Sequence, residues 1–244
     1  MASKGSLSKP TNTKLGPLIH SWSITAGRHA SCPGETSLCR ARCYAKRGFF
    51  VMPTSKNSHS RNFAFSKTPL FTSWMQSTLI VHPVRVMRIH VAGDFYDSEY
   101  VSKWYTIAEN SPHITFFAYT RSWQVAEMLP SLIRLSALPN MQLWWSIDRM
   151  TGPAPVIKGV RRAYMAINDM DAATAPDDCD LVFRDSPRTV MKKANGVMVC
   201  PPENGTHPKR KVTCTACGVC WNKRGAKLDD VIFADTEDPV EIVF

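Results

Sequence analysis

The sequence predicts an α/β fold built on a parallel sheet. In the middle of the 244-residue chain, short apolar segments rich in β-branched residues alternate with segments of helical periodicity, which is typical of right-handed βαβ units. The predicted strands end in polar residues, which share one edge of a parallel sheet or barrel, where ligands bind. These strand-end residues are Gly93 and Asp94, Thr120 and Arg121, and Ser146 and Asp148. One such residue alone is more often a turn or cap, but their recurrence favours a shared pocket.

The strands are predicted from their apolar runs. They lie at residues 19–25, 84–91, 114–119 and 141–147, with less regular candidates at 161–167 and 181–183. Strand 84–91 is rich in β-branched residues and ends where Gly93 breaks the pattern.

The helices are predicted from apolar spacing and from their start and stop signals. The first segments are residues 43–50 and 62–80, broken around 52–60 and at Pro69. A third helix starts at an N-cap, either Asp97 or Ser98, and stops at residues 110–112. A fourth is capped by Ser122, continues to residue 133 and is distorted at Pro130.

Composition and charge limit the class of protein. The chain is 44% hydrophobic, which is enough for a core that needs no disulfides. No apolar run is long enough to span a membrane, and the polar start, residues 1–10, has no apolar leader. Residues 1–17 are expected to form a flexible lead-in. We therefore expect a cytoplasmic protein with reduced thiols and no membrane partner. The sequence contains no P-loop, GxGxxG, GxSxG or HExxH motif.

Seven of the eight cysteines form two groups whose spacing suits iron–sulfur ligation. The first group has three members and the second has four, whereas Cys179 lies outside both. Three thiolates leave one iron of a [4Fe–4S] cluster open, and four close the cluster. We therefore expect two [4Fe–4S] clusters as cofactors. The predicted ligands are Cys32, Cys39 and Cys43 for the open cluster, and Cys200, Cys214, Cys217 and Cys220 for the closed one.

Zinc is the alternative metal at both sites. In the first group it would be completed by His20, His29 or Glu35, and in the second His207 would replace one thiol. The CxxCxxC run of the second group is more typical of a cluster than of zinc.

The formal charge of +10 is concentrated around the two cysteine groups. Three interpretations are open: a solvated surface, compensation of anionic thiolates, or an anionic partner such as nucleic acid. The basic residues are Arg40, Arg42, Lys46 and Arg47 at the first group, and Lys209, Arg210, Lys211, Lys223, Arg224 and Lys227 at the second.

Four segments carry a resemblance to a known family. Residues 32–45 (CPGETSLCRARCYA), 88–96 (RIHVAGDFY), 117–123 (FAYTRSW) and 214–221 (CTACGVCW) resemble the gene-product-eighty-eight family of phage and plasmid proteins. More distantly, the order of these segments, with a three-cysteine loop after the first strand, is similar to that of the radical S-adenosylmethionine (SAM) superfamily. That resemblance implies a partial (β/α) barrel at residues 18–185 with the open cluster, and a C-terminal auxiliary-cluster region with an acidic tail at 186–244.

The same resemblance implies SAM as a cofactor. Ala92, Gly93 and Asp94 match the segment that supports the SAM amino group, and Ser146 and Asp148 match ribose-contacting positions. The sequence departs from the superfamily in two places: its triad is Cx6Cx3C rather than CxxxCxxC, and its second-strand motif has one glycine rather than two.

Three functions follow as hypotheses. The first is a radical-SAM-like enzyme that receives electrons from a donor protein. The second is a metal-stabilised nucleic-acid-binding or regulatory protein, and the third is a redox protein without a catalytic radical. The substrate, the reaction and the oligomeric state have no signal in the sequence.

Overall fold

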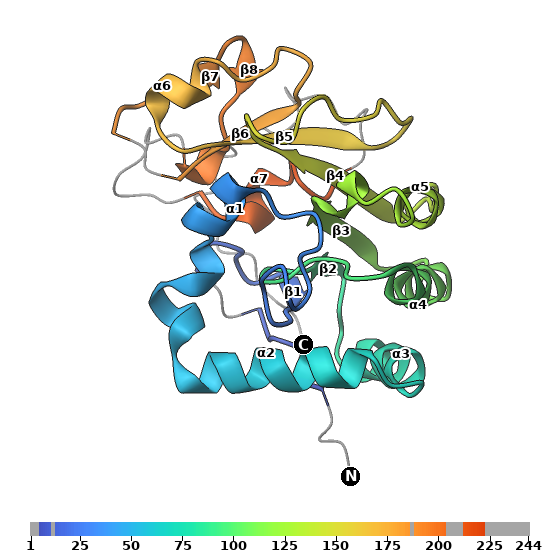
Figure 1. Cartoon of the computed structure of the whole chain (residues 1–244). Coiled ribbons are helices and arrows are strands. Elements are labelled where there is room, and N and C mark those ends of the chain that lie inside the picture. The colour runs from blue at the N-terminus through green and yellow to red at the C-terminus, as the bar shows by residue number, and fades with distance from the viewer. Residues whose placement is uncertain (1–4, 11–12, 186–187, 204–211, 223–244) are drawn as a thin grey trace.

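Six parallel strands form the centre of the molecule in the computed structural model, which describes residues 5–10, 13–185, 188–203 and 212–222 (Figure 1). They are hydrogen-bonded in chain order from β1 to β6, and the sheet curves as a half-barrel. All six predicted strands are confirmed. They are β1 (Ile19–Trp22), β2 (Val86–Ile89), β3 (Thr115–Thr120), β4 (Met141–Ile147), β5 (Arg161–Ala166) and β6 (Leu181–Arg184).

The longer helices cover the outer face of the sheet, and Figure 1 shows α3, α4 and α5 along one side of it. These longer helices are α2 (Pro53–Ser66), α3 (Phe71–Val81), α4 (Ser98–Glu109) and α5 (Leu129–Ser136). The short helix α6 (Asp169–Ala172) also contributes to the larger core. Two short helices, α1 (Ser37–Arg42) and α7 (Cys214–Cys217), lie on the inner side (Figure 1).

Alternation along the strands gives the sheet two different faces. In β2, Met87 and Ile89 belong to the larger core under the outer helices, whereas Val86 belongs to a smaller inner core. The inner core also contains Phe117, Trp144 and all four cysteines of the second group. Because side chains alternate along a strand, the cysteines meet only one face of the sheet.

Helix α4 shows how the sequence positions these elements. The Asp97 side chain accepts a hydrogen bond of 2.7 Å from the Tyr100 backbone N–H and caps the helix. Its apolar stripe, which includes Trp104 and Ile107, is buried against the sheet. The predicted helix and its N-cap are confirmed.

Four details of the helix predictions were wrong. Residues 52–60 do not break a helix, since α2 begins at Pro53, whose fixed φ suits a first helical turn. Pro130 likewise opens α5 and does not distort it, and Ser122 begins only a 3₁₀ turn, η3 (Ser122–Gln124). The helix predicted at 43–50 is two 3₁₀ turns, η1 (Tyr44–Lys46) and η2 (Gly48–Val51), separated by extended backbone at Arg47.

The segment after β6 returns to the sheet as a small hairpin. Strands β7 (Lys193–Ala194) and β8 (Val197–Met198) pair across Asn195 and Gly196, which both have positive φ as a type I′ turn requires. The Cys200 N–H then donates to the Val182 carbonyl at 2.9 Å. This contact places the first cysteine of the second group beside β6, just before η4 (Pro201–Glu203).

The lead-in at residues 1–17 is packed where the structure describes it. Ser8 pairs with Ser21 of β1, and Leu15 is buried. The N–H groups of Cys214 and Thr215 donate to the carbonyls of Lys14 and Leu15. The lead-in therefore holds α7, about 200 residues later in the chain, against the sheet.

Among the residues that the structure describes, no helix is long and apolar enough to cross a membrane.

Candidate metal and cofactor site

All seven cysteines of the two groups line one cavity, which we call the thiol cavity. It has a volume of about 470 Å³ and lies on the inner face of the sheet. Strands β2 to β6 supply its floor, and the cysteine loops with α1, η1 and α7 supply its walls. The structure therefore brings together two cysteine groups that are 157 residues apart at their nearest members, Cys43 and Cys200.

The first cysteine group lies on a loop that is fixed at both ends. The Cys32 sulfur accepts a hydrogen bond from the Gly27 N–H at 3.3 Å. Thr36 caps α1 by accepting the Cys39 N–H at 2.9 Å. Cys39 lies within α1, whereas Cys43 is the C-cap of this helix and not part of it.

Gly34 explains why this loop can lie so close to the strand ends. A Cβ at this position would stand 2.1 Å from the Arg121 carbonyl oxygen, so only glycine fits. The Gln124 side chain adds a hydrogen bond of 2.7 Å to the Gly34 carbonyl. The loop of the first group is thus seated directly on the end of β3.

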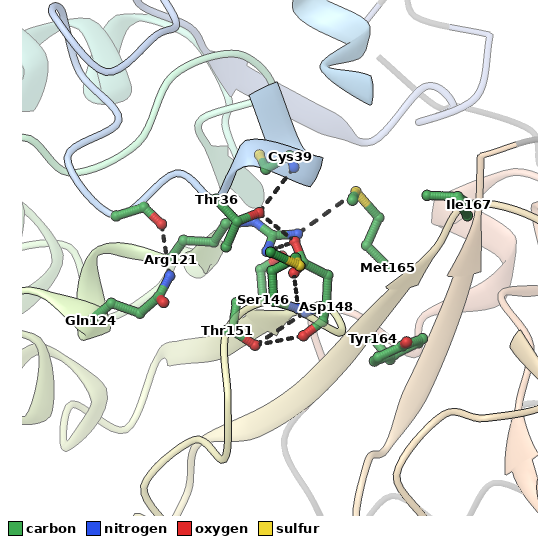
Figure 2. A network of polar contacts seen from close by, with 12 residues as sticks. Thr36, Cys39, Arg121, Gln124, Ser146, Asp148, Thr151, Tyr164, Met165 and Ile167 are labelled. Carbon is green, nitrogen blue, oxygen red and sulfur yellow. Dashed lines mark hydrogen bonds and ion pairs between the residues drawn. The ribbon is translucent and has the colours of Figure 1, made fainter. Parts of the chain in front are cut away.

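A buried polar network, which we call the Arg121 clamp, joins this loop to β3 and β4 (Figure 2). The Arg121 guanidinium pairs with the Asp148 carboxylate at 2.6 Å, and both side chains are almost fully buried. The Thr36 hydroxyl donates to the same carboxylate oxygen at 2.7 Å. Thr36 therefore accepts from α1 and donates to the strand end, which fixes Cys39 relative to the sheet.

The segment after β2 has a special backbone. His90 has a φ of 62°, a left-handed conformation that is uncommon outside glycine. Gly93 has a φ of 90°, and a Cβ there would stand 2.4 Å from Ile24. The missing side chain at Gly93 therefore makes room for Ile24 of the protein itself.

Asp94 is buried and held by backbone donors. Its carboxylate accepts the Phe95 N–H at 2.7 Å and the Arg121 N–H at 2.8 Å. Burial raises the pKa of Asp94 to about 6, although these hydrogen bonds oppose the shift. It does not cap the following helix, a role that belongs to Asp97.

Four of the five predicted SAM-contacting residues line the thiol cavity together with the first cysteine group: Ala92, Gly93, Asp94 and Ser146. Asp148 does not line it, because its carboxylate lies in the Arg121 clamp and also accepts the Met150 N–H at 2.8 Å. The structure thus gives Asp148 a positioning contact, whereas ligand contact at the other four remains a prediction.

The second cysteine group is more deeply buried than the first. Cys200, Cys214, Cys217 and Cys220 are each at most 9% exposed, whereas the first three are half-buried. The Trp144 side chain donates to the Cys220 carbonyl at 2.8 Å, which fixes the end of this loop to β4. Gly218, with a φ of 70°, ends α7 and turns the chain back toward the cavity.

Burial favours the protonated form of the Cys32, Cys217 and Cys220 thiols in the absence of a metal. It raises the pKa of Cys32 to about 12, with Asp94 and Cys39 adding to the effect. It raises the pKa of Cys217 to about 11 and that of Cys220 to about 12. All eight cysteines are free thiols. Because only the thiolate binds a metal, loading the site would release protons.

The donor set suits iron–sulfur clusters in its chemistry, since thiolates are the usual cluster ligands. In the described part of the chain, no group of three or more His, Cys, Asp or Glu side chains is arranged to hold a metal ion. The assignment of the seven thiols as ligands therefore remains a prediction, supported by their spacing and by the shared cavity.

The remaining candidate ligands are dispersed. Glu35 lines the cavity and pairs with Arg40 at 2.8 Å, whereas His20 and His29 are not among the lining residues. His207 lies outside the described residues. Cys179 is buried in the larger core on the outer side of the sheet, away from the thiol cavity.

Comparison with known proteins identifies the family. The family model "Gene product 88" matches residues 2–223. The chain belongs to the gene product 88 family. This confirms the first part of the resemblance seen in the sequence.

Two curated relatives of this gene product 88 chain come from mycobacteriophages. The "Gene 88 protein" of Mycobacterium phage L5 is 24% identical over 248 residues, covering 95% of this chain and 92% of the relative. The "Gene 88 protein" of Mycobacterium phage D29 is 26% identical over 153 residues, covering 58% of this chain and 62% of the relative. No solved structure matches this chain. These comparisons do not support the radical SAM resemblance, which stands on the sequence motifs alone.

Sequence reasoning missed two residues of this site. Thr36 gave no signal because its partner Asp148 is 112 residues away in the chain. Arg88 lies within the segment 88–96. A charged residue in an otherwise apolar strand could have marked it as part of the site.

Proposed function

We propose that this gene product 88 chain is an iron–sulfur enzyme of the radical SAM type. The observation that carries the proposal is the thiol cavity, in which three and four cysteines face one space at the inner side of a parallel half-barrel. Plain core cysteines have no reason to gather around a cavity from two distant segments. The first group would hold an open [4Fe–4S] cluster, and the second a closed auxiliary cluster.

The neighbouring strand ends support SAM as the second cofactor. Ala92, Gly93 and Asp94 follow β2, Ser146 lies near the end of β4, and all four line the cavity beside the first cysteine group. A bound open cluster and SAM would supply radical chemistry through one-electron reduction of SAM. The electron would come from a donor protein.

The chain's own residues would position these groups. The Arg121 clamp holds the start of α1, and with it the Cys39 backbone, against the strand ends. The Asp94 carboxylate faces the cavity with both oxygens already held by backbone N–H groups. A pre-oriented carboxylate of this kind is suited to a ligand ammonium group.

SAM binding and cleavage by anaerobically reconstituted protein test the proposal. With dithionite as reductant, we expect formation of methionine and 5′-deoxyadenosine, measured by mass spectrometry. Cys39→Ala should abolish the products, whereas Cys179→Ala, which alters a cysteine outside the cavity, should leave them unchanged. Protein that carries its full iron but neither binds nor cleaves SAM would overturn the SAM assignment.

Asp94→Asn separates a ligand contact from a structural one. Asn keeps one acceptor oxygen but turns its NH₂ toward the second backbone donor, so some loss of melting temperature is expected in any case. The removal of the charge should lower SAM affinity about tenfold. Unchanged affinity with a lowered melting temperature would show that Asp94 only fixes the loop between β2 and α4.

A further inference from the structure

Arg88 is a cation on the floor of the thiol cavity whose role none of the contacts above explains. It lies in the middle of β2, between Ser21 of β1 and Phe117 of β3 in the sheet register. It shares the inner face with Val86, because residues two positions apart on a strand point to the same side of the sheet. Its side chain lines the cavity that the two cysteine groups also line.

The other charged side chains of the cavity have opposite charges or backbone donors as partners. Lys14 pairs with Glu203, Arg184 with Asp169, Arg121 with Asp148, Arg42 with Asp185, and Glu35 with Arg40. Asp94 is held by two backbone N–H groups. Among the described residues, Arg88 has no acidic partner, and its buried Nε has no hydrogen-bond acceptor.

The neighbour of the Arg88 guanidinium in the described part of the chain is aromatic and not acidic. The guanidinium lies over the Tyr119 ring, with its central carbon 5.6 Å from the ring centroid. Its Nε is buried without an acceptor. A partly buried cation without a counter-charge is costly, which favours a ligand that supplies one.

We infer that the thiol cavity takes a ligand with an anionic group, a carboxylate or a phosphate, that binds Arg88 between the two cysteine groups. A guanidinium fork matches both kinds of oxyanion in a bidentate geometry, which a lysine cannot reproduce. The apolar wall beside it, including Phe117 and Phe183, would contact the rest of the ligand. This inference deepens the proposed function, because it assigns a substrate class to the same cavity.

Arginine-directed labelling of the intact protein tests the inference without any substitution. Anaerobic protein is treated with phenylglyoxal in the presence of pyrophosphate, citrate or sodium chloride at equal ionic strength, and labelled peptides are quantified by mass spectrometry. We expect one of the two oxyanions to protect Arg88 at least several-fold, whereas Arg85, exposed just before β2, should be labelled equally in all samples. Protection by pyrophosphate alone indicates a phosphate ligand, and protection by citrate alone a carboxylate. Equal labelling of Arg88 in all three samples would overturn the inference.

Substitution at Arg88 gives the second measurement. By titration calorimetry, Arg88→Met should weaken binding of the protecting anion about tenfold or more, and Arg88→Lys less so. The exposed control Arg85→Met should bind as the unchanged protein does. The iron content of each variant, and its folding by circular dichroism, are measured in parallel. A folded Arg88→Met protein that has lost its iron, while the labelling shows no anion protection, would mean that Arg88 only balances cluster thiolates.

Iron content separates this inference from the proposed function. Anion protection of Arg88 in protein that binds no iron would support the anion site and contradict the iron–sulfur enzyme. Protein that carries its full iron but shows no anion protection of Arg88 would support the iron–sulfur enzyme and contradict the anion site.

Discussion

At the scale of single residues, the Arg121 clamp is the contact on which the open cysteine site most depends. Removing one partner of a buried ion pair leaves the other charge without compensation, which typically costs about 3–5 kcal/mol. Arg121 and Asp148 are 7% and 0% exposed, so solvent cannot replace the missing partner.

We therefore expect Asp148→Asn to lower the free energy of unfolding by about 3 kcal/mol, measured by urea denaturation. The control is Asp178→Asn, which removes the exposed partner of Arg162 and should cost less than about 1 kcal/mol. Similar losses for the two variants would show that the clamp contributes no more than a surface pair.

His90 provides a pH-dependent prediction at the same scale. Burial and the nearby Arg88 lower the pKa of His90 to about 3, whereas the unfolded chain protonates it near 6.5. The folded state thus binds fewer protons, and stability falls as the pH drops from about 6.5 toward 3. The slope from this residue approaches about 1.4 kcal/mol per pH unit.

His90→Asn should flatten this part of the stability profile. Asn tolerates the positive φ at this position, so the variant should keep the backbone of the segment that ends β2. Urea denaturation of reduced protein at pH 7.5 and 5 measures the difference in unfolding free energy. If the acid-induced loss is as large in His90→Asn as in the unchanged protein, His90 is not its source.

At the scale of elements, the proposal makes the stability of α7 depend on metal binding more than that of α1. Four residues form α7, too few for a helix to be stable alone. It is held by backbone contacts to the lead-in and, in the proposal, by four thiolates that join Cys200 to Cys220. Metal binding at such a site is coupled to folding.

Cys214→Ala should therefore lower the melting temperature of anaerobic, metal-loaded protein more than Cys39→Ala does. Cys39 is half-buried on a loop that Gly34 and the Arg121 clamp already fix without any metal. Equal melting temperatures for the two variants would contradict this ranking.

The elements also show what a sequence can predict. The six strands were found because their apolar runs are dense and each ends at a turn signal. The start of α2 was missed because its buried residues, Asn62, Phe65 and Ser66, all lie in its second half, so its first two turns have no apolar stripe. The Arg121 clamp had no local pattern, since Thr36 and Asp148 meet only when the sheet has formed.

At the scale of the whole molecule, the positive charge has more internal partners than its distribution in the sequence suggested. Arg40 pairs with Glu35, and Arg42 and Arg47 pair with Asp185. These three belong to the basic set beside the first cysteine group. The basic residues at 209–211 and 223–227 lie outside the described residues.

Binding to nucleic acid tests what the remaining charge does. If several phosphates are contacted, affinity for RNA or DNA should fall steeply with salt, with a log–log slope of about −0.7 to −0.9 per phosphate. Fluorescence anisotropy with anaerobic protein at low and near-physiological salt measures this slope. No binding even at low salt would leave a small-molecule or protein substrate for the cavity.

The thiol cavity brings together the two cysteine groups, which lie near opposite ends of the sequence. We expect it to hold two iron–sulfur clusters. Anaerobically purified protein, reconstituted with iron and sulfide, should be brown and should hold about eight irons with a matching amount of labile sulfide, as two [4Fe–4S] clusters require. Stoichiometric zinc with no labile sulfide in the purified protein, and no iron taken up on reconstitution, would contradict it.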